Sequence, residues 1–90
     1  MRHAGATTLQ TLESLLARLR ALPGLVERTP GCFYKDKGSS AFLHFHEDVS
    51  GTHADVKLSA DGFTRVRAET AQERDALVAL VAKALETARR

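Results

Sequence analysis

The sequence predicts an α+β fold, namely a two-layer sandwich in which a helix, an antiparallel meander of three or four strands and a second helix follow one another. Apolar residues recur at helical spacing near both ends of the chain, whereas between them they alternate with polar residues in the two-residue period of strands. Each predicted helix has one apolar stripe. We therefore expect both helices to cover the same face of the sheet and to leave its other face open.

Composition narrows the class of protein. Ninety residues with 43% hydrophobic content predict a single domain over residues 1–90, with residues 1–6 as a flexible tail. Cys32 is the only cysteine, which excludes a disulfide-stabilised secreted scaffold. The sequence shows no export signal and no apolar run of about eighteen residues, so we expect a cytoplasmic protein without a membrane partner. The net charge of +2 is too small to indicate a nucleic-acid binder by itself.

The first helix is predicted from about Thr8 to Ala21. Thr7 followed by Gln10 has the form of a capping box, and Pro23-Gly24 ends the pattern. Its apolar stripe is made of leucines at helical spacing, which are Leu9, Leu12, Leu15, Leu16, Leu19 and Leu22.

The strands follow this helix. Residues 25–29 are predicted to be extended or irregular, because Thr29 precedes Pro30 and is biased away from helix. Alternation is clearest in residues 41–48, which we interpret as the central strand, paired in a hairpin with the next run. The predicted strands are residues 31–36, 41–48, 52–58 and 63–67, joined by turns at 37–40, 49–51 and 59–62.

The second helix has the strongest signals. Thr70 with Glu73 three residues later forms a capping box, which fixes the start of the helix. The stripe expected to pack on the core is Leu77, Leu80, Val81, Ala84 and Leu85.

This order of elements, over nearly the whole chain, resembles that of the frataxin-like two-layer α/β sandwiches and of the small bacterial MmcQ/YjbR domains. The resemblance rests on element order and contains no diagnostic motif. Phe33-Tyr34 followed by residues 42–48 is also similar to a bacterial family, and that similarity implies no activity. Frataxins carry an iron-associated acidic ridge on the first helix and first strand edge. Because the first helix here has only Glu13, the resemblance does not extend to iron binding.

The simplest register of the central hairpin keeps the apolar faces together, with Leu43 opposite Val56 and Phe45 opposite Ala54. On the other side His46 then faces His53, and His44 faces Asp55. Across the next turn the same reasoning predicts three pairs, which are Val56 with Val66, Lys57 with Arg65, and Asp55 with Arg67.

The surface opposite the helices, which we call the open face, should therefore combine histidines, cations and two phenylalanines. On the strand that precedes the central one, Cys32 and Tyr34 are expected to point toward the core. The predicted members of the open face are Phe33, Lys35, Phe42, His44, His46, His53, Asp55, Lys57, Arg65 and Arg67.

The open face predicts a binding or interaction module. One hypothesis is a protein partner, including a second copy of the chain as in a homodimer, or an anionic ligand. The residues that would carry it are Phe42, Lys57, Arg65 and Arg67, with the histidines tuning the charge.

Two alternatives use the same surface. His44, His46, His53 and Asp55 offer the nitrogen and oxygen ligands that zinc or another divalent metal accepts. A nucleic-acid partner could be held by the cations, with bases stacked on exposed phenylalanines, although the sequence contains no RNP-like motif.

Catalysis is not favoured. Glu47 and Asp48 are adjacent, so on a strand they point to opposite faces and do not form an acid/base pair. A His44–Asp55 dyad would lack a nucleophile, because Ser39 and Ser40 lie at the far end of the strand.

Overall fold

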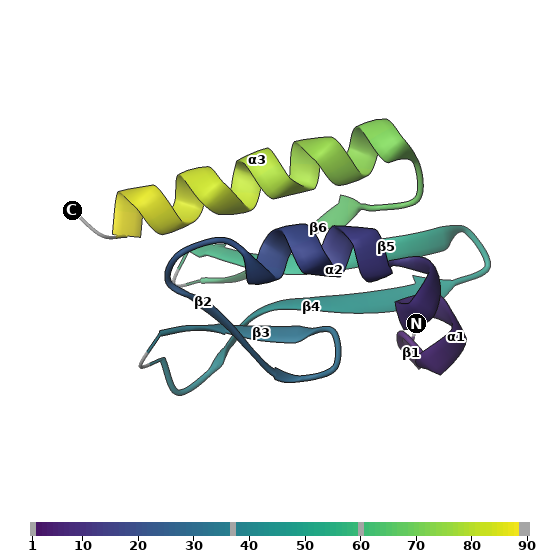
Figure 1. Cartoon of the computed structure of the whole chain (residues 1–90), viewed down its shortest axis with the longest axis horizontal. Coiled ribbons are helices and arrows are strands. Elements are labelled where there is room, and N and C mark those ends of the chain that lie inside the picture. The colour runs from purple at the N-terminus through teal and green to yellow at the C-terminus, as the bar shows by residue number, and fades with distance from the viewer. Residues whose placement is uncertain (1, 37, 60, 89–90) are drawn as a thin grey trace.

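The computed structural model of the chain describes residues 2–36, 38–59 and 61–88. It is an α+β fold with an antiparallel sheet and helices toward both ends of the chain (Figure 1). Five strands lie in the order β2-β3-β4-β5-β6, and the short β1 also pairs with β4. The elements are β1 (Arg2–His3), α1 (Ala6–Thr11), α2 (Glu13–Arg20), β2 (Leu25–Thr29), β3 (Cys32–Lys35), β4 (Ala41–Asp48), β5 (Gly51–Ser59), β6 (Gly62–Arg67) and α3 (Ala71–Ala88).

None of the helices in the described part of the chain has both the length and the hydropathy that a membrane crossing requires.

The N-terminal segment differs from the predicted flexible tail. Arg2–His3 forms β1, which pairs with Glu47 and His46 of β4, and the backbone amide of Ala4 donates to the carbonyl of Phe45 at 3.2 Å. β1 therefore continues the edge of β4 beyond the part that pairs with β3.

The predicted first helix is divided into α1 and α2. Leu12, with φ −87° and ψ 4°, leaves the helical conformation between them, and its side chain is fully buried. The Thr7–Gln10 capping box does not form, because Gly5 is the N-cap and no side chain caps α1. The hydroxyl of Thr8 instead donates to the carboxylate of Glu47 on β4, which ties α1 to the sheet.

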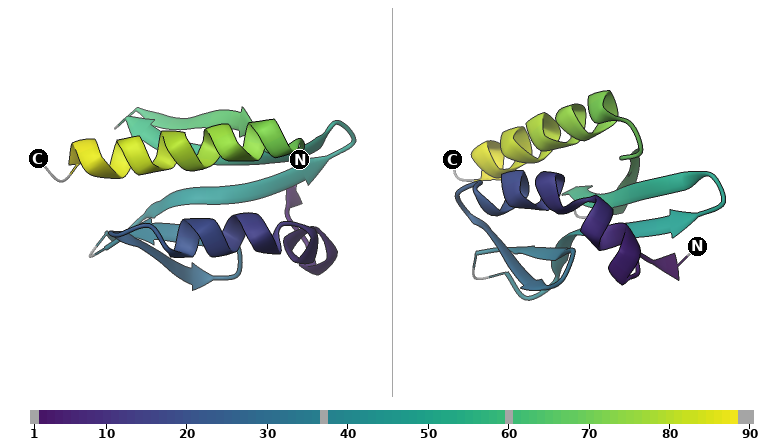
Figure 2. Two further views of the ribbon diagram at one scale, coloured as in Figure 1. Left: turned by 45° about the horizontal axis from the view of Figure 1, so that its top comes forward. Right: turned by 45° about the vertical axis from the view of Figure 1, so that its right-hand side comes forward.

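One hydrophobic core joins the helices to the sheet. α2 packs against α3 and β2, and α3 packs against β6 (Figure 2). Most of the predicted stripe of α3 is confirmed, since Leu77, Val81 and Leu85 are buried and Ala84 packs against the core, but Leu80 is not part of the core and lines a surface hollow instead. The largest fully buried side chains are Phe33, Phe45, Leu12, Leu15, Leu16, Leu19, Leu43, Leu77, Val56 and Val81.

The capping box of α3 is also confirmed. The hydroxyl of Thr70 accepts a hydrogen bond from the amide of Glu73 at 3.1 Å, and the carboxylate of Glu73 accepts one from the amide of Thr70 at 2.9 Å. These reciprocal bonds satisfy amides that the first turn of a helix leaves without intrahelical partners.

The register of the central hairpin is as predicted. Leu43 faces Val56 and Phe45 faces Ala54 on the core side, while His44 faces Asp55 and His46 faces His53 on the other. The hairpin closes beside Gly51, whose φ of +122° favours glycine. The two-residue alternation and the turn at 49–51 were sufficient to predict this register, because a slip by one residue would expose every aliphatic side chain.

The face assignment of β3 was wrong. Phe33 is fully buried opposite Leu43, whereas Cys32 lies opposite His44 on the side away from the core. Between the Phe33–Leu43 and Tyr34–Ala41 pairs, β4 has one extra residue, Phe42, which makes a β-bulge. The bulge allows consecutive residues of β4 to be buried, so Phe42 belongs to the core and not to the open face.

The predicted register between β5 and β6 was wrong by two residues. Asp55 pairs with Arg65, Ala54 with Val66 and His53 with Arg67, and the ladder shifts again between Val56 and Ser59. Opposite charges directly across a sheet are stabilising and like charges are not, so the observed Asp55–Arg65 pair is better than the predicted Lys57–Arg65 pair. The predicted turns at 37–40 and 59–62 each include a residue, 37 or 60, outside the described ranges.

Candidate metal site

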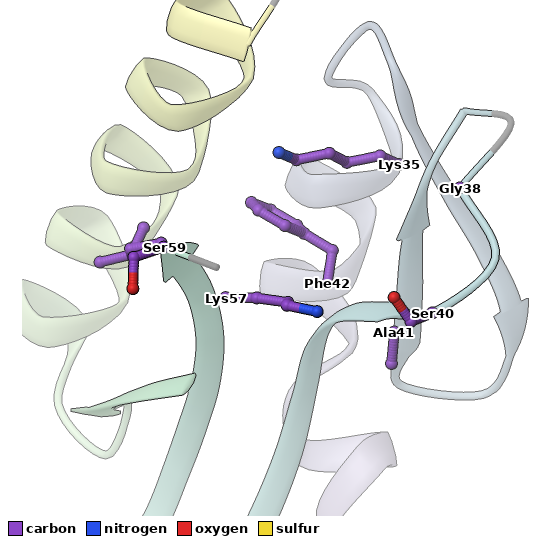
Figure 3. A pocket seen from close by; sticks show the side chains of 8 residues that line it. Lys35, Gly38, Ser40, Ala41, Phe42, Lys57 and Ser59 are labelled. Atoms are coloured by element: carbon purple, nitrogen blue, oxygen red, sulfur yellow. The ribbon is translucent and has the colours of Figure 1, made fainter. Parts of the chain in front are cut away.

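The eight residues predicted to form one binding surface divide into two groups. Phe42 is only 3% exposed, and it lines a pocket together with Lys57 (Figure 3). A neighbouring hollow contains the same two residues with Leu80 of α3, so this region reaches the helix layer. The remaining six residues, His44, His46, His53, Asp55, Arg65 and Arg67, all lie on adjacent strands of the predicted open face.

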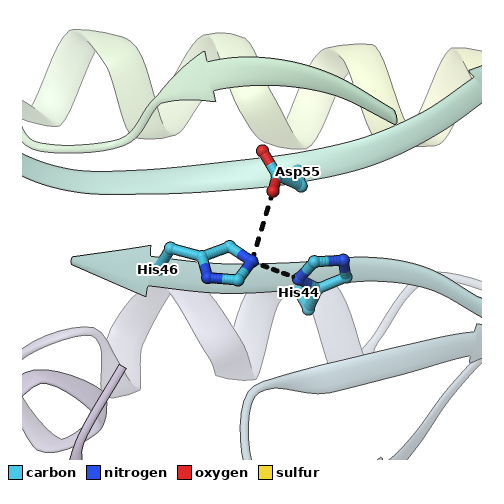
Figure 4. Close-up of side chains that lie close together, drawn as sticks. All are labelled: His44, His46 and Asp55. Carbon is cyan, nitrogen blue, oxygen red and sulfur yellow. Dashed lines mark hydrogen bonds and ion pairs between the residues drawn. The ribbon is translucent and has the colours of Figure 1, made fainter. Parts of the chain in front are cut away.

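Three of these six residues converge on one point. His44 and His46 lie two residues apart on β4, and Asp55 lies opposite His44 on β5 (Figure 4). Nε2 of His46 is 2.6 Å from Nδ1 of His44 and 3.2 Å from Oδ2 of Asp55. One ligand atom from each residue lies within 4.8 Å of the others, and we call these three residues the histidine cluster.

The histidine cluster is largely shielded from water. The side chains of His46 and Asp55 are 13% and 12% exposed, and the ring of Phe63 lies edge-on to that of His44 at 4.7 Å between centroids. Burial makes an unpaired polar group costly, so the nitrogen and oxygen atoms of the cluster face one another. The short Nε2–Nδ1 distance is a hydrogen bond in which one imidazole donates and the other accepts.

The donor set fits a borderline metal ion. Imidazole nitrogen and carboxylate oxygen are common zinc ligands, with bonds of about 2.0–2.2 Å, so two ligand atoms of a tetrahedral ion lie about 3.3 Å apart. The 3.2 Å between His46 and Asp55 already matches this separation. The two imidazole nitrogens would need to separate by less than about 1 Å, and the widest separation in the cluster, 4.8 Å, would need to shorten by about 1.5 Å, which side-chain rotations can provide.

Arg65 supports one side of Asp55. Its Nε lies 3.2 Å from Oδ1 of Asp55, which leaves Oδ2 directed toward His46. This contact orients the carboxylate as an outer-shell partner does in metal sites. It also places a positive charge beside the cluster, which opposes cation binding. Arg65 is 54% exposed, so solvent screens part of that repulsion.

His53 does not join the histidine cluster, although it was predicted as a ligand. It lies opposite His46 and is only 7% exposed, but its nitrogens are not among the converging ligand atoms. Its Nδ1 is buried without a hydrogen-bond partner among the described residues. A buried imidazole with one unpaired nitrogen is a packing element here and not part of the cluster.

Arg67 is likewise directed elsewhere. Its Nε lies 3.2 Å from the Glu73 carboxylate of α3, and its Nη1 donates to the carbonyl of Ser50 at 3.2 Å. Arg67 therefore links the hairpin turn to the start of α3.

Of the four predicted metal ligands, the cluster contains His44, His46 and Asp55.

Sequence reasoning missed Cys32 as a neighbour of this face. Cys32 is directly opposite His44 and is partly buried. The available signal was the size of Phe33, because burying a phenylalanine is worth more than burying a cysteine. With that criterion Phe33 would have been assigned to the core and Cys32 to the opposite face of the sheet.

Comparisons of the chain with protein-family profiles, with curated proteins and with solved structures find no match.

Proposed function

We propose that the protein binds a divalent transition-metal ion, with zinc as the first candidate, through Nδ1 of His44, Nε2 of His46 and Oδ2 of Asp55. The observation that carries the proposal is the convergence of these three ligand atoms within 4.8 Å on two paired strands. The pairing of β4 with β5 already holds the backbones of His44 and Asp55 opposite each other, so little conformational entropy is lost when the ion binds.

The competing functions lose support from the same geometry. Phe33 and Phe42 are 0% and 3% exposed, so they offer neither a sticky patch to a protein nor a stacking platform to bases. Arg65 and Arg67 are each engaged with a carboxylate. A protein partner, a second copy or a nucleic acid on this face stays a prediction of the sequence.

We propose the two-layer arrangement, in which the helices cover one face of the sheet and the histidine cluster lies on the other. Three protein ligands leave a fourth tetrahedral position for water or for a group of another molecule. An ion held by residues of β4 and β5 would also join the two central strands of the sheet.

Titration of the metal-free protein with zinc chloride in a calorimeter tests the proposal. We expect saturable binding of one ion. Zinc at one hundred times its dissociation constant should raise the melting temperature by roughly 10–20 °C, since such binding stabilises by about 2.7 kcal/mol. Protons compete for imidazole nitrogens, so the affinity should fall between about pH 7.5 and about pH 5.5.

Substitutions of the proposed ligands, compared with a control outside the site, test which residues bind the ion. His44→Ala and Asp55→Asn should each abolish saturable zinc binding, because two remaining ligands cannot hold the ion tightly. Asp61→Asn removes an exposed carboxylate in the β5–β6 turn and should bind zinc as the wild type does. Zinc binding that survives Asp55→Asn, or no binding by the wild type, would contradict the proposal.

A further inference from the structure

A second site lies at the other end of the central strand, where Phe42 forms the floor of a pair of adjoining hollows. We call them together the lysine pocket. One hollow has a volume of about 460 Å³ and the other of about 390 Å³. They share four lining residues, which are Lys35, Phe42, Lys57 and Leu58. These volumes fall within the range of about 300–1,000 Å³ that is usual for small-molecule sites.

Every lysine that the structure describes lines this pocket. Lys35 comes from β3, Lys57 from β5 and Lys83 from α3. Figure 3 shows Lys35, Phe42 and Lys57 beside the first hollow. The ammonium of Lys35 lies 4.8 Å from the centroid of the Phe42 ring, a cation–π contact that directs its charge over the pocket floor. The lysines therefore come from three separate elements: Lys35 and Lys57 line both hollows, and Lys83 lines the second.

The arginines contrast with these lysines. Arg18 pairs with Asp75 at 2.6 Å, and Arg20 pairs with Glu13 at 2.6 Å and with Glu27 at 2.5 Å. Within the described ranges, none of the three lysines has a carboxylate within 4.0 Å, and no Asp or Glu lines either hollow. Five carboxylates are thus paired with arginines, whereas the lysines have no ion pair among the described residues.

The geometry points to an anion site: we propose that the lysine pocket binds a small molecule that carries a phosphate or diphosphate group. Three ammonium groups can surround such a group with charge-assisted hydrogen bonds, and lysine is a common phosphate ligand. The hydroxyls of Ser40 and Ser59 line the first hollow and can add donors. Leu58 and Leu80 line the other hollow and offer apolar surface to the rest of the ligand.

A small ligand fits better than a nucleic acid. The two hollows are local depressions lined by β3, β4 and β5, with α3 lining the second, whereas a nucleic acid needs a basic track along its backbone and exposed aromatic rings. Phe42 is buried as the floor of the pocket and cannot stack with a base as an exposed ring does.

The test uses the full chain treated with EDTA, so that the histidine cluster plays no part. Sodium pyrophosphate is titrated while amide resonances are followed by NMR. We expect saturable shifts at residues 35, 40–42, 57–59 and 80–84. Lys57→Gln and Lys83→Gln should each weaken the apparent affinity about tenfold, as expected when one charge-assisted contact is lost.

Arg28→Gln is the matched control. Arg28 is an exposed cation whose guanidinium lies 4.4 Å above the Tyr34 ring, outside the lysine pocket. Unchanged affinity in Arg28→Gln together with losses in both lysine variants would support the site. Equal losses in all three variants would show a non-specific charge effect and overturn it. Absence of saturable shifts, or tighter binding of a single-stranded RNA that Lys57→Gln leaves intact, would overturn it as well.

Discussion

Glu69 accepts a hydrogen bond from the backbone amide of Thr52, with 2.7 Å between Oε2 and N. The backbone amide of Ala68 in turn donates to the carbonyl of Thr52 at 3.0 Å. The short segment between β6 and α3 is thereby joined to the first residues of β5. These two bonds hold the last helix in register with the central hairpin.

This contact predicts an acid-sensitive part of the stability. The hydrogen bond from the Thr52 backbone holds the pKa of Glu69 below its ordinary value, and the amide of Thr70, the residue before α3, lowers the pKa of Glu73 in the same way. A carboxyl group with a lowered folded-state pKa stabilises the fold above its unfolded pKa of about 4.3, and the stabilisation is lost as the pH falls through the folded value.

Glu69→Gln should therefore reduce the loss of stability between about pH 5 and about pH 2, measured by urea unfolding at each pH. The glutamine carbonyl can still accept from Thr52 but carries no charge, so at neutral pH the variant should be less stable than the wild type by the amount of this missing acid-dependent loss. Asp36→Asn, an exposed carboxylate beyond β3, serves as the control. A pH profile identical to that of the wild type in Glu69→Gln would contradict the assignment.

The orientation of β3 predicts which side chain supports the core. Phe33→Ala removes a fully buried ring and should destabilise the protein by about 3–5 kcal/mol. Tyr34→Ala changes the neighbouring residue on the other face, where Arg28 covers the ring, and should cost about 1 kcal/mol. Denaturant midpoints of the two variants check this order. A larger loss for Tyr34→Ala would mean that β3 presents the opposite face to the core.

Because Nδ1 of His53 has no hydrogen-bond partner among the described residues, position 53 should tolerate an apolar residue. His53→Leu removes a buried polar atom that lacks a partner among the described residues, so stability should change by less than about 1 kcal/mol or increase. Zinc affinity should stay the same, because His53 lies outside the histidine cluster. Loss of zinc binding in His53→Leu, with the fold retained by circular dichroism, would return His53 to the ligand set.

The charge of Arg65 beside Asp55 is expected to lower the zinc affinity of the candidate metal site. Arg65→Gln removes a positive charge that contacts Asp55, and zinc affinity should rise about tenfold at low salt. The increase should shrink in high salt, since the Arg65 side chain is half exposed. Calorimetric titrations at two salt concentrations provide the measurement. Weaker binding in Arg65→Gln would show that orienting Asp55 matters more than the repulsion.

The misplacement of Phe42 and Lys57 has one physical source. The pairing of β4 with β5 follows from alternation, and His44 opposite Asp55 was predicted correctly from it. Alternation fails where a strand contains an extra residue, as at Phe42 in β4 and between Val56 and Ser59 in β5. No residue in these stretches signals a bulge. Phe42 and Lys57 were for this reason placed with the histidines, and the lysine pocket was not anticipated.

The C-terminal helix was easier to predict from the sequence than the N-terminal helices. The Thr70–Glu73 capping box and an uninterrupted stripe predicted α3 correctly. The division between α1 and α2 at Leu12 involves neither proline nor glycine, and it accompanies a tertiary contact from Thr8 to Glu47. Such a contact depends on the whole fold and is invisible to a local pattern.

The pairing of β1 with β4 has a practical consequence for handling the protein. His3 is aligned with His46 and Arg2 with Glu47 in that ladder, so the described N-terminal end of the chain lies beside one of the imidazoles that we expect to hold zinc. A polyhistidine purification tag fused at that end would bring competing imidazoles to the same spot and would distort every metal titration. Recombinant work should therefore use a histidine-free handle, or cleave the tag before metals are measured.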